Sequence, residues 1–146
     1  MPVFLRVTLI ATAAFIVVEA IPLAWFNFVL CWVIIAGAAY QYPHLILGKV
    51  QAMSSSVGFA VGMGAAIGAI VNTIGMCGAL VLHVVFGALG AANTHDATAN
   101  TTGVLNSVSA VGDLFQVAGA PFVGAALGAI GGLVGGSTIP RTSQVV

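Results

Sequence analysis

Long apolar segments that contain almost no charge are the feature that most restricts how this chain can fold. Of its 146 residues, 60% are hydrophobic, and only three basic and three acidic residues are present. These are Arg6, Lys49, Arg141, Glu19, Asp96 and Asp113. All lie near the ends of apolar segments or between them, since a charge at the centre of a bilayer costs at least ~2.5–3.5 kcal/mol. Because a soluble domain carries about 25% charged residues, the sequence predicts an integral membrane protein with almost no soluble part.

Four apolar segments are predicted to cross the membrane as helices. They cover residues 3–20, 23–40, 57–92 and 118–137. We interpret the first segment as a retained span rather than a signal peptide, and Pro22 as the junction of a tight helical hairpin. The first two segments are each close to the ~20 residues that cross the hydrocarbon layer. The expected fold class is therefore an all-α membrane bundle that forms one domain.

The third segment leaves the number of spans open. It is interrupted only by Asn72, Thr73 and His83. At ~1.5 Å per residue it is too long for one straight span and barely long enough for two. A helix through Asn72 gives four spans, which we prefer because the basic residues then share one side of the membrane; a turn at residues 72–75 gives five. Asn72 itself we interpret as the cap of a turn rather than as the lining of a polar break in a helix.

Polar connections separate the later segments. Residues 41–56 form the first polar connection, and residues 93–103 form a polar loop. Residues 104–117 combine apolar positions at helical spacing with a polar stripe. This pattern predicts an amphipathic helix that either lies in the membrane interface or extends the last span.

Glycines spaced four residues apart are the strongest local signal. The rows contain Gly124, Gly128, Gly132 and Gly136 in the last segment, and Ser54, Gly58, Gly62 and Ala66, together with Ala60, Gly64 and Gly68, around the third. Residues four apart share one helix face, and a face without side chains lets another backbone approach closely. We therefore expect glycine-zipper packing, with the partner helix in this chain or in another subunit. Two similar heptapeptides, GAAIGAI from residue 64 and GAALGAI from residue 124, indicate either a repeat whose helices pair or independent convergence on small residues.

A few side chains could carry chemistry. His83, inside an apolar segment, is either a ligand of a haem or chlorophyll metal or, as we expect, hydrogen-bonded to a neighbouring carbonyl. His44, expected in a loop, could hold a pigment at the interface. Glu19 is either a proton or cation site or, as we expect, an interfacial carboxylate. Cys31 and Cys77 are interpreted as buried small hydrophobic residues rather than a disulfide.

Catalytic and nucleotide-binding motifs are not found in the sequence. The chain has no His-x-x-x-His, no Cys-x-x-Cys and no Gly-x-Ser-x-Gly elbow, and its glycine-rich runs contain no lysine that could reach a phosphate. The net charge of zero gives no basic surface for nucleic acid. We therefore expect neither an enzyme, nor a metal site, nor a nucleic-acid-binding protein.

The layout resembles small, uncharacterised bacterial four-helix membrane proteins. The resemblance rests on Asn27 and Cys31 in the second span, the Gly/Ala-rich stretch 58–68 and the Gly/Ala-rich ending 124–136. It implies no functional residues. A likeness to the proteolipid ring subunits of rotary ATPases fails, because neither glycine-rich span carries a carboxylate at its middle.

The function we expect is that of a small non-catalytic subunit that packs through its glycine-rich helices within a larger complex, photosynthetic or respiratory for example. The alternatives are a small oligomeric channel or transporter, and a self-assembling structural protein of a filament or virion. The expected partners are membrane lipid, including bound lipid, and other subunits or copies of the chain. The expected location is a bacterial or archaeal inner membrane.

Overall fold

The described part of the chain is almost entirely helical. A computed structural model describes residues 2–19, 24–47, 56–93 and 99–140, although not every side chain within them. The helices are α1 (Val3–Glu19), α2 (Ala24–Leu45), α4 (Ser56–Asn93) and α5 (Ala99–Ser137). The described residues contain no strand, so the all-helical prediction is confirmed.

Helix α4 is continuous through Asn72, as the preferred alternative predicted, so the turn considered at residues 72–75 is not formed. No proline interrupts α4, and both polar residues at its middle have partners that fit a helix. The Thr73 hydroxyl donates to the Ala69 carbonyl one turn back, at 2.7 Å, while Asn72 reaches across to α5. Asn72 is therefore a packing residue rather than a cap, and the break in the third segment that the five-span alternative requires is not observed.

Two other boundaries differ from the expectation. Helix α2 continues to Leu45 because Tyr42 packs into the core and Pro43 is fully buried, so His44 lies in a helix and not in a loop. Helix α5 begins at Ala99, which shortens the predicted polar loop. Residues 104–117 form the first half of α5 and run directly into the last apolar segment.

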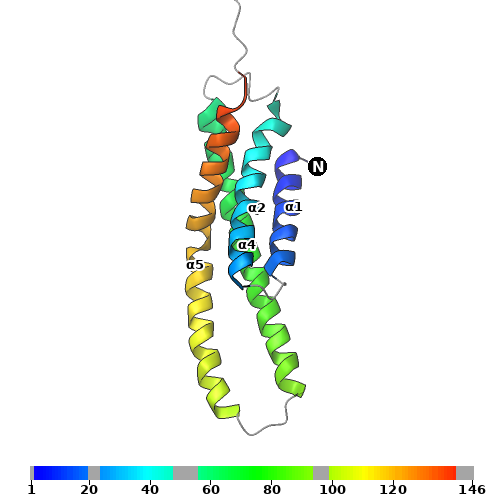
Figure 1. Cartoon of the computed structure of the whole chain (residues 1–146), viewed down its shortest axis with the longest axis vertical. Helices are drawn as coiled ribbons and strands as arrows, with labels where there is room; N and C mark the ends of the chain where they lie inside the picture. Colours follow the sequence, from blue (N-terminus) through cyan, green and yellow to red (C-terminus); the bar gives the residue numbers. More distant parts are fainter. Residues whose placement is uncertain (1, 20–23, 48–55, 94–98, 141–146) are drawn as a thin grey trace, which may run out of the picture.

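The two long helices form the axis of the molecule. Helices α4 and α5 contain 38 and 39 residues, which corresponds to about 57–59 Å. Their segments Val57–Leu82 and Leu114–Ser137 are long and apolar enough to cross a membrane. Helices α1 and α2 are shorter and pack on one part of this pair, so α4 and α5 extend past them as a hairpin (Figure 1).

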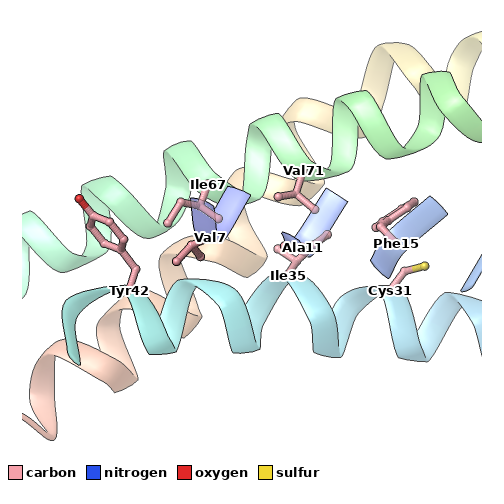
Figure 2. Packing of buried hydrophobic residues seen from close by; sticks show 8 residues of the cluster. All are labelled: Val7, Ala11, Phe15, Cys31, Ile35, Tyr42, Ile67 and Val71. Carbon is pink, nitrogen blue, oxygen red and sulfur yellow. The ribbon is translucent and has the colours of Figure 1, made fainter. Parts of the chain in front are cut away.

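Helices α2 and α4 form the middle of the bundle. Each contacts both α1 and α5, whereas α1 and α5 do not contact each other in the part of the chain that the structure describes. Side chains four residues apart on α1 point into the groove between α2 and α4 (Figure 2). The core they form contains Val7, Ala11, Phe15, Cys31, Ile35, Tyr42, Ile67 and Val71.

The two cysteines have different environments. Cys31 is buried in the core, and both thiols are free, as predicted. Cys77 is exposed, so its predicted burial is wrong. It lies on the outer face of α4 between Ile74 and Val81, which are also exposed. The apolar sequence around Cys77 had indicated burial, but apolar side chains cover the outside of this bundle as well.

Polar side chains are buried inside the bundle. Thr8 and Thr12 on α1 are less than a tenth exposed. The Thr8 hydroxyl donates to the Phe4 carbonyl at 2.9 Å, whereas Oγ1 of Thr12 has no hydrogen-bond partner. An unsatisfied buried hydroxyl costs about 1–3 kcal/mol.

The unsatisfied hydroxyl predicts that Thr12→Val will stabilise the protein. Valine keeps the branched shape and removes the unpaired oxygen, so we expect the free energy of unfolding to rise by about 1 kcal/mol. Thr8→Val is the matched control, and it should be neutral or destabilising because it removes a satisfied hydroxyl. Unfolding of both variants in detergent, monitored by circular dichroism, gives the change in the free energy of unfolding relative to the wild type. A Thr12→Val protein less stable than the wild type would contradict the prediction.

Candidate functional site

Glycines bring the backbones of α4 and α5 into direct contact. A Cβ placed on Gly64 would meet the carbonyl oxygen of Gly128, and one placed on Gly68 would meet that of Gly124. Conversely, a Cβ placed on Gly124 or Gly128 would meet the carbonyl oxygen of the same partner glycine on α4. A Cβ on Gly68 would also lie 3.0 Å from the Cα of Gly128. No side chain fits between the two helices over these turns, so dispersion and weak Cα–H···O contacts hold them together.

The contact extends along one row of small residues on each helix. Gly132 faces the carbonyl oxygen of Ala60, so the row of Ala60, Gly64 and Gly68 on α4 lies against α5. Gly136, at the end of the α5 row, is buried. The similar heptapeptides at residues 64–70 and 124–130 therefore lie on opposite sides of the same interface.

The other predicted row on α4 faces away from α5. Gly58 and Gly62 are exposed, and a Cβ on Gly62 would have no neighbour within 4 Å. Ser54, at the start of this row, lies outside the described residues. Within the described chain, Gly62 therefore packs against no other helix, and Gly58 is exposed on the same row.

Further glycine contacts follow a pattern that the sequence analysis missed. A Cβ on Gly131 would lie 3.0 Å from the Cα of Ala36, and one on Gly135 would lie 3.0 Å from the Cα of Tyr40. Both partners are on α2. The signal is the repeated Gly-Gly pair at 131–132 and 135–136, because adjacent glycines give two bare faces about 100° apart. Helix α5 therefore lies against α2 and α4 at once.

Helix α1 uses a different kind of glycine contact. The Phe15 ring covers Gly75 on α4, and Ile16 lies over Gly78, where a Cβ would be 3.1 Å from the Ile16 Cδ1. These glycines make room for side chains rather than for a second backbone. Phe15 is 1% exposed.

A buried amide marks one end of the α4–α5 contact. Nδ2 of Asn72 donates a hydrogen bond of 2.7 Å to the Ala120 carbonyl. Both residues are buried, and their side chain and backbone belong to different helices. Such a directional bond fixes the register of two faces that would otherwise slide, because glycine rows have little relief of their own.

The candidate ligand and cation residues have separate environments. Nε2 of His44 lies 3.1 Å from the Thr138 hydroxyl oxygen, which itself donates to the Gly135 carbonyl, so the ring N–H is the donor. This bond ties the end of α2 to the end of α5. Glu19 accepts a 3.3 Å hydrogen bond from the Cys31 thiol, linking α1 to α2.

No metal centre is formed among the described residues. They contain no group of three or more His, Cys, Asp or Glu side chains that could hold a metal ion. His83 lies in α4, but its side chain is outside what the structure describes. His44 and Glu19 belong to separate contacts, so the structure does not bring these two candidate residues together.

Comparisons with known proteins give no relative: no family model, no curated protein and no solved structure matches the chain. The function must therefore be argued from the helix contacts and the surface alone.

The interface predicts opposite effects for two neighbouring glycines. Gly64→Ala places a methyl group against the backbone of Gly128 and forces α4 and α5 apart, so we expect a loss of about 1–3 kcal/mol of stability. Gly62→Ala, two residues earlier, meets open space and should be neutral or stabilising by up to about 1 kcal/mol, since alanine favours the helix.

Thermal unfolding of the two variants side by side, in the same detergent, separates them. Equal stability of the two alanine variants would show that the α4–α5 contact does not depend on the missing side chain at Gly64.

Proposed function

We propose that the chain is an integral membrane protein and that its described helices, α1, α2, α4 and α5, all lie in the bilayer. The observation that carries this proposal is the distribution of polarity. Large apolar side chains cover the outside, with Ile10 64%, Val33 61% and Phe122 77% exposed, while Thr8 and Asn72 are buried. A water-soluble bundle has the opposite arrangement.

The burial of the two longest apolar segments supports the same proposal. Only 33% of an 18-residue apolar stretch of α4 and 28% of the corresponding stretch of α5 are buried inside the bundle. The core helix of a soluble protein of this hydropathy would be mostly buried. Lipid is the solvent that matches an apolar surface of this extent, and membrane lipid is therefore part of the proposed environment.

Cys77 offers a direct test of the membrane location, because it lies on the outer surface of α4. In native membranes we expect a charged, water-soluble maleimide to leave Cys77 unlabelled until the protein is denatured. The control is Ser137→Cys in a Cys77→Ser background, at the exposed end of α5, which should label without denaturation. Rapid labelling of Cys77 together with extraction by alkaline carbonate would rule out the proposed location.

Within the membrane, we propose that the protein is a non-catalytic subunit of a larger complex in a bacterial or archaeal inner membrane. Two features support this role. The described residues form contacts between helices rather than a catalytic set, and Gly58 and Gly62 leave a bare strip on α4 that faces outward. A bare strip of this kind admits a helix of another subunit at backbone distance, while bound lipid covers the rest of the surface.

The channel alternative receives no support from the polar residues near the centre. The Asn72 amide is bonded to α5, and the Thr73 hydroxyl is bonded within α4. Neither side chain lines a path along the bundle. A pigment at His83 remains a separate hypothesis within the proposed role.

The subunit role predicts that the protein co-migrates with other membrane polypeptides after extraction in a mild detergent. Gly62→Leu should abolish this co-migration without unfolding the bundle, because position 62 has open space. Gly37→Leu on α2 is the matched control, since a Cβ there also has no neighbour within 4 Å.

Sizing, mass spectrometry and an absorption spectrum of the same peak decide the outcome. A colourless homo-oligomer without other polypeptides, unaffected by Gly62→Leu, would contradict the subunit role and favour self-assembly.

A further inference from the structure

Among the described side chains, the glycine contact between α4 and α5 ends at one level of the bundle. Gly124 and Ala120 on α5 are buried, whereas Gln116 and Gly112, which continue the same spacing of four, are both exposed. A Cβ on Gly112 would have no neighbour within 4 Å. Beyond this level the lower parts of α4 and α5 run apart from each other, below the ends of α1 and α2 (Figure 1). The Asn72–Ala120 hydrogen bond therefore lies at the boundary between a packed part and an open part of the pair.

Proline follows directly after this boundary. Pro121 lies inside α5 and has no N–H, so it cannot bond the Val117 carbonyl one turn back. Its ring also crowds that turn, and proline is the commonest cause of a helix kink. Helix α5 is thus weakest at the point where its contact with α4 ends.

The matching part of α4 is held in place by α1. Phe15 covers Gly75 and Ile16 covers Gly78, both of which lie after Asn72 in α4. In the described chain α5 has no contact with α1. The two helices therefore differ beyond the Asn72–Ala120 hydrogen bond. Helix α1 supports α4 for at least one further turn, as far as Gly78, and it does not support α5.

From these observations we propose that Asn72, Ala120 and Pro121 form a hinge, at which the first half of α5 swings relative to the packed bundle. The hydrogen bond from the Asn72 amide to Ala120 limits the motion. The part of α5 after Pro121 stays in place because its glycines are packed against α4. The hinge does not depend on whether the bundle has a partner subunit.

Distances between spin labels on the full-length protein test the hinge. In a Cys31→Ala, Cys77→Ser background, one label is placed at Ile10 on α1. The second is placed on α5 either before the hinge, at Leu114, or after it, at Ile130; these two positions are similarly exposed, at 61% and 59%. We expect the Ile10/Leu114 distance distribution to be at least twofold wider than the Ile10/Ile130 distribution. Equal widths would overturn the hinge.

Two substitutions and one further label pair sharpen the test. Pro121→Ala should narrow the Ile10/Leu114 distribution to the width of the reference pair, and Asn72→Leu should widen it while leaving Ile10/Ile130 unchanged. If Pro121→Ala does not fold, Asn72→Leu still tests the proposal. An unchanged width of the Ile10/Leu114 distribution in that variant would overturn the role of the Asn72–Ala120 hydrogen bond. The pair Ile10/Val84, with its second label on α4, should remain as narrow as the reference, and a width equal to that of Ile10/Leu114 would overturn the proposed asymmetry.

Discussion

Direct contact between the backbones of α4 and α5 is the interaction on which the rest of the bundle depends. Glycine in a helix costs up to about 1 kcal/mol relative to alanine, and α5 carries several. In lipid this cost is reduced, because a helix that unwinds loses backbone hydrogen bonds that the hydrocarbon cannot replace. The bare faces then bring Gly68 and Gly124 together. Because α5 is also bare at Gly131 and Gly135, it can lie against α2 at the same distance.

The two sides of the bundle are held by different means. On the α5 side, two glycine-lined backbones meet, and the hydrogen bond from the Asn72 amide fixes their register. On the α1 side, the Phe15 ring fills the space that Gly75 leaves open, in the manner of a knob in a hole. The contact between α4 and α5 allows the backbones to approach closely, but its flat surfaces do little to stop the helices from sliding. The contact between α1 and α4 interlocks side chains and therefore resists sliding. Helix α1 therefore fixes α4, and α4 provides the surface against which α5 is placed.

The sequence predicted the helices better than it predicted which faces meet. Spacing by four identifies rows on α4, but Gly62 and Gly64 lie about 200° apart around a helix, so only one row can face α5. Choosing between them requires knowing where the neighbours are. The error at Asn72 has the same origin, because an asparagine in an apolar run satisfies its amide equally well as a local cap or across to a carbonyl 48 residues away. The end of α2 depends on the burial of Tyr42 and Pro43, which is also a property of the packed bundle.

The interior of the bundle is occupied by the contacts that hold it together. Among the described residues, Asn72 is bonded to α5 and Thr8 to its own helix, and Oγ1 of Thr12 is the buried side-chain oxygen without a partner. A single hydroxyl has too few donors and acceptors to bind a substrate. In the proposed role, the contacts with other subunits are made by the outer surface, where Gly62 leaves backbone accessible, and by the parts of α4 and α5 that extend past the shorter helices.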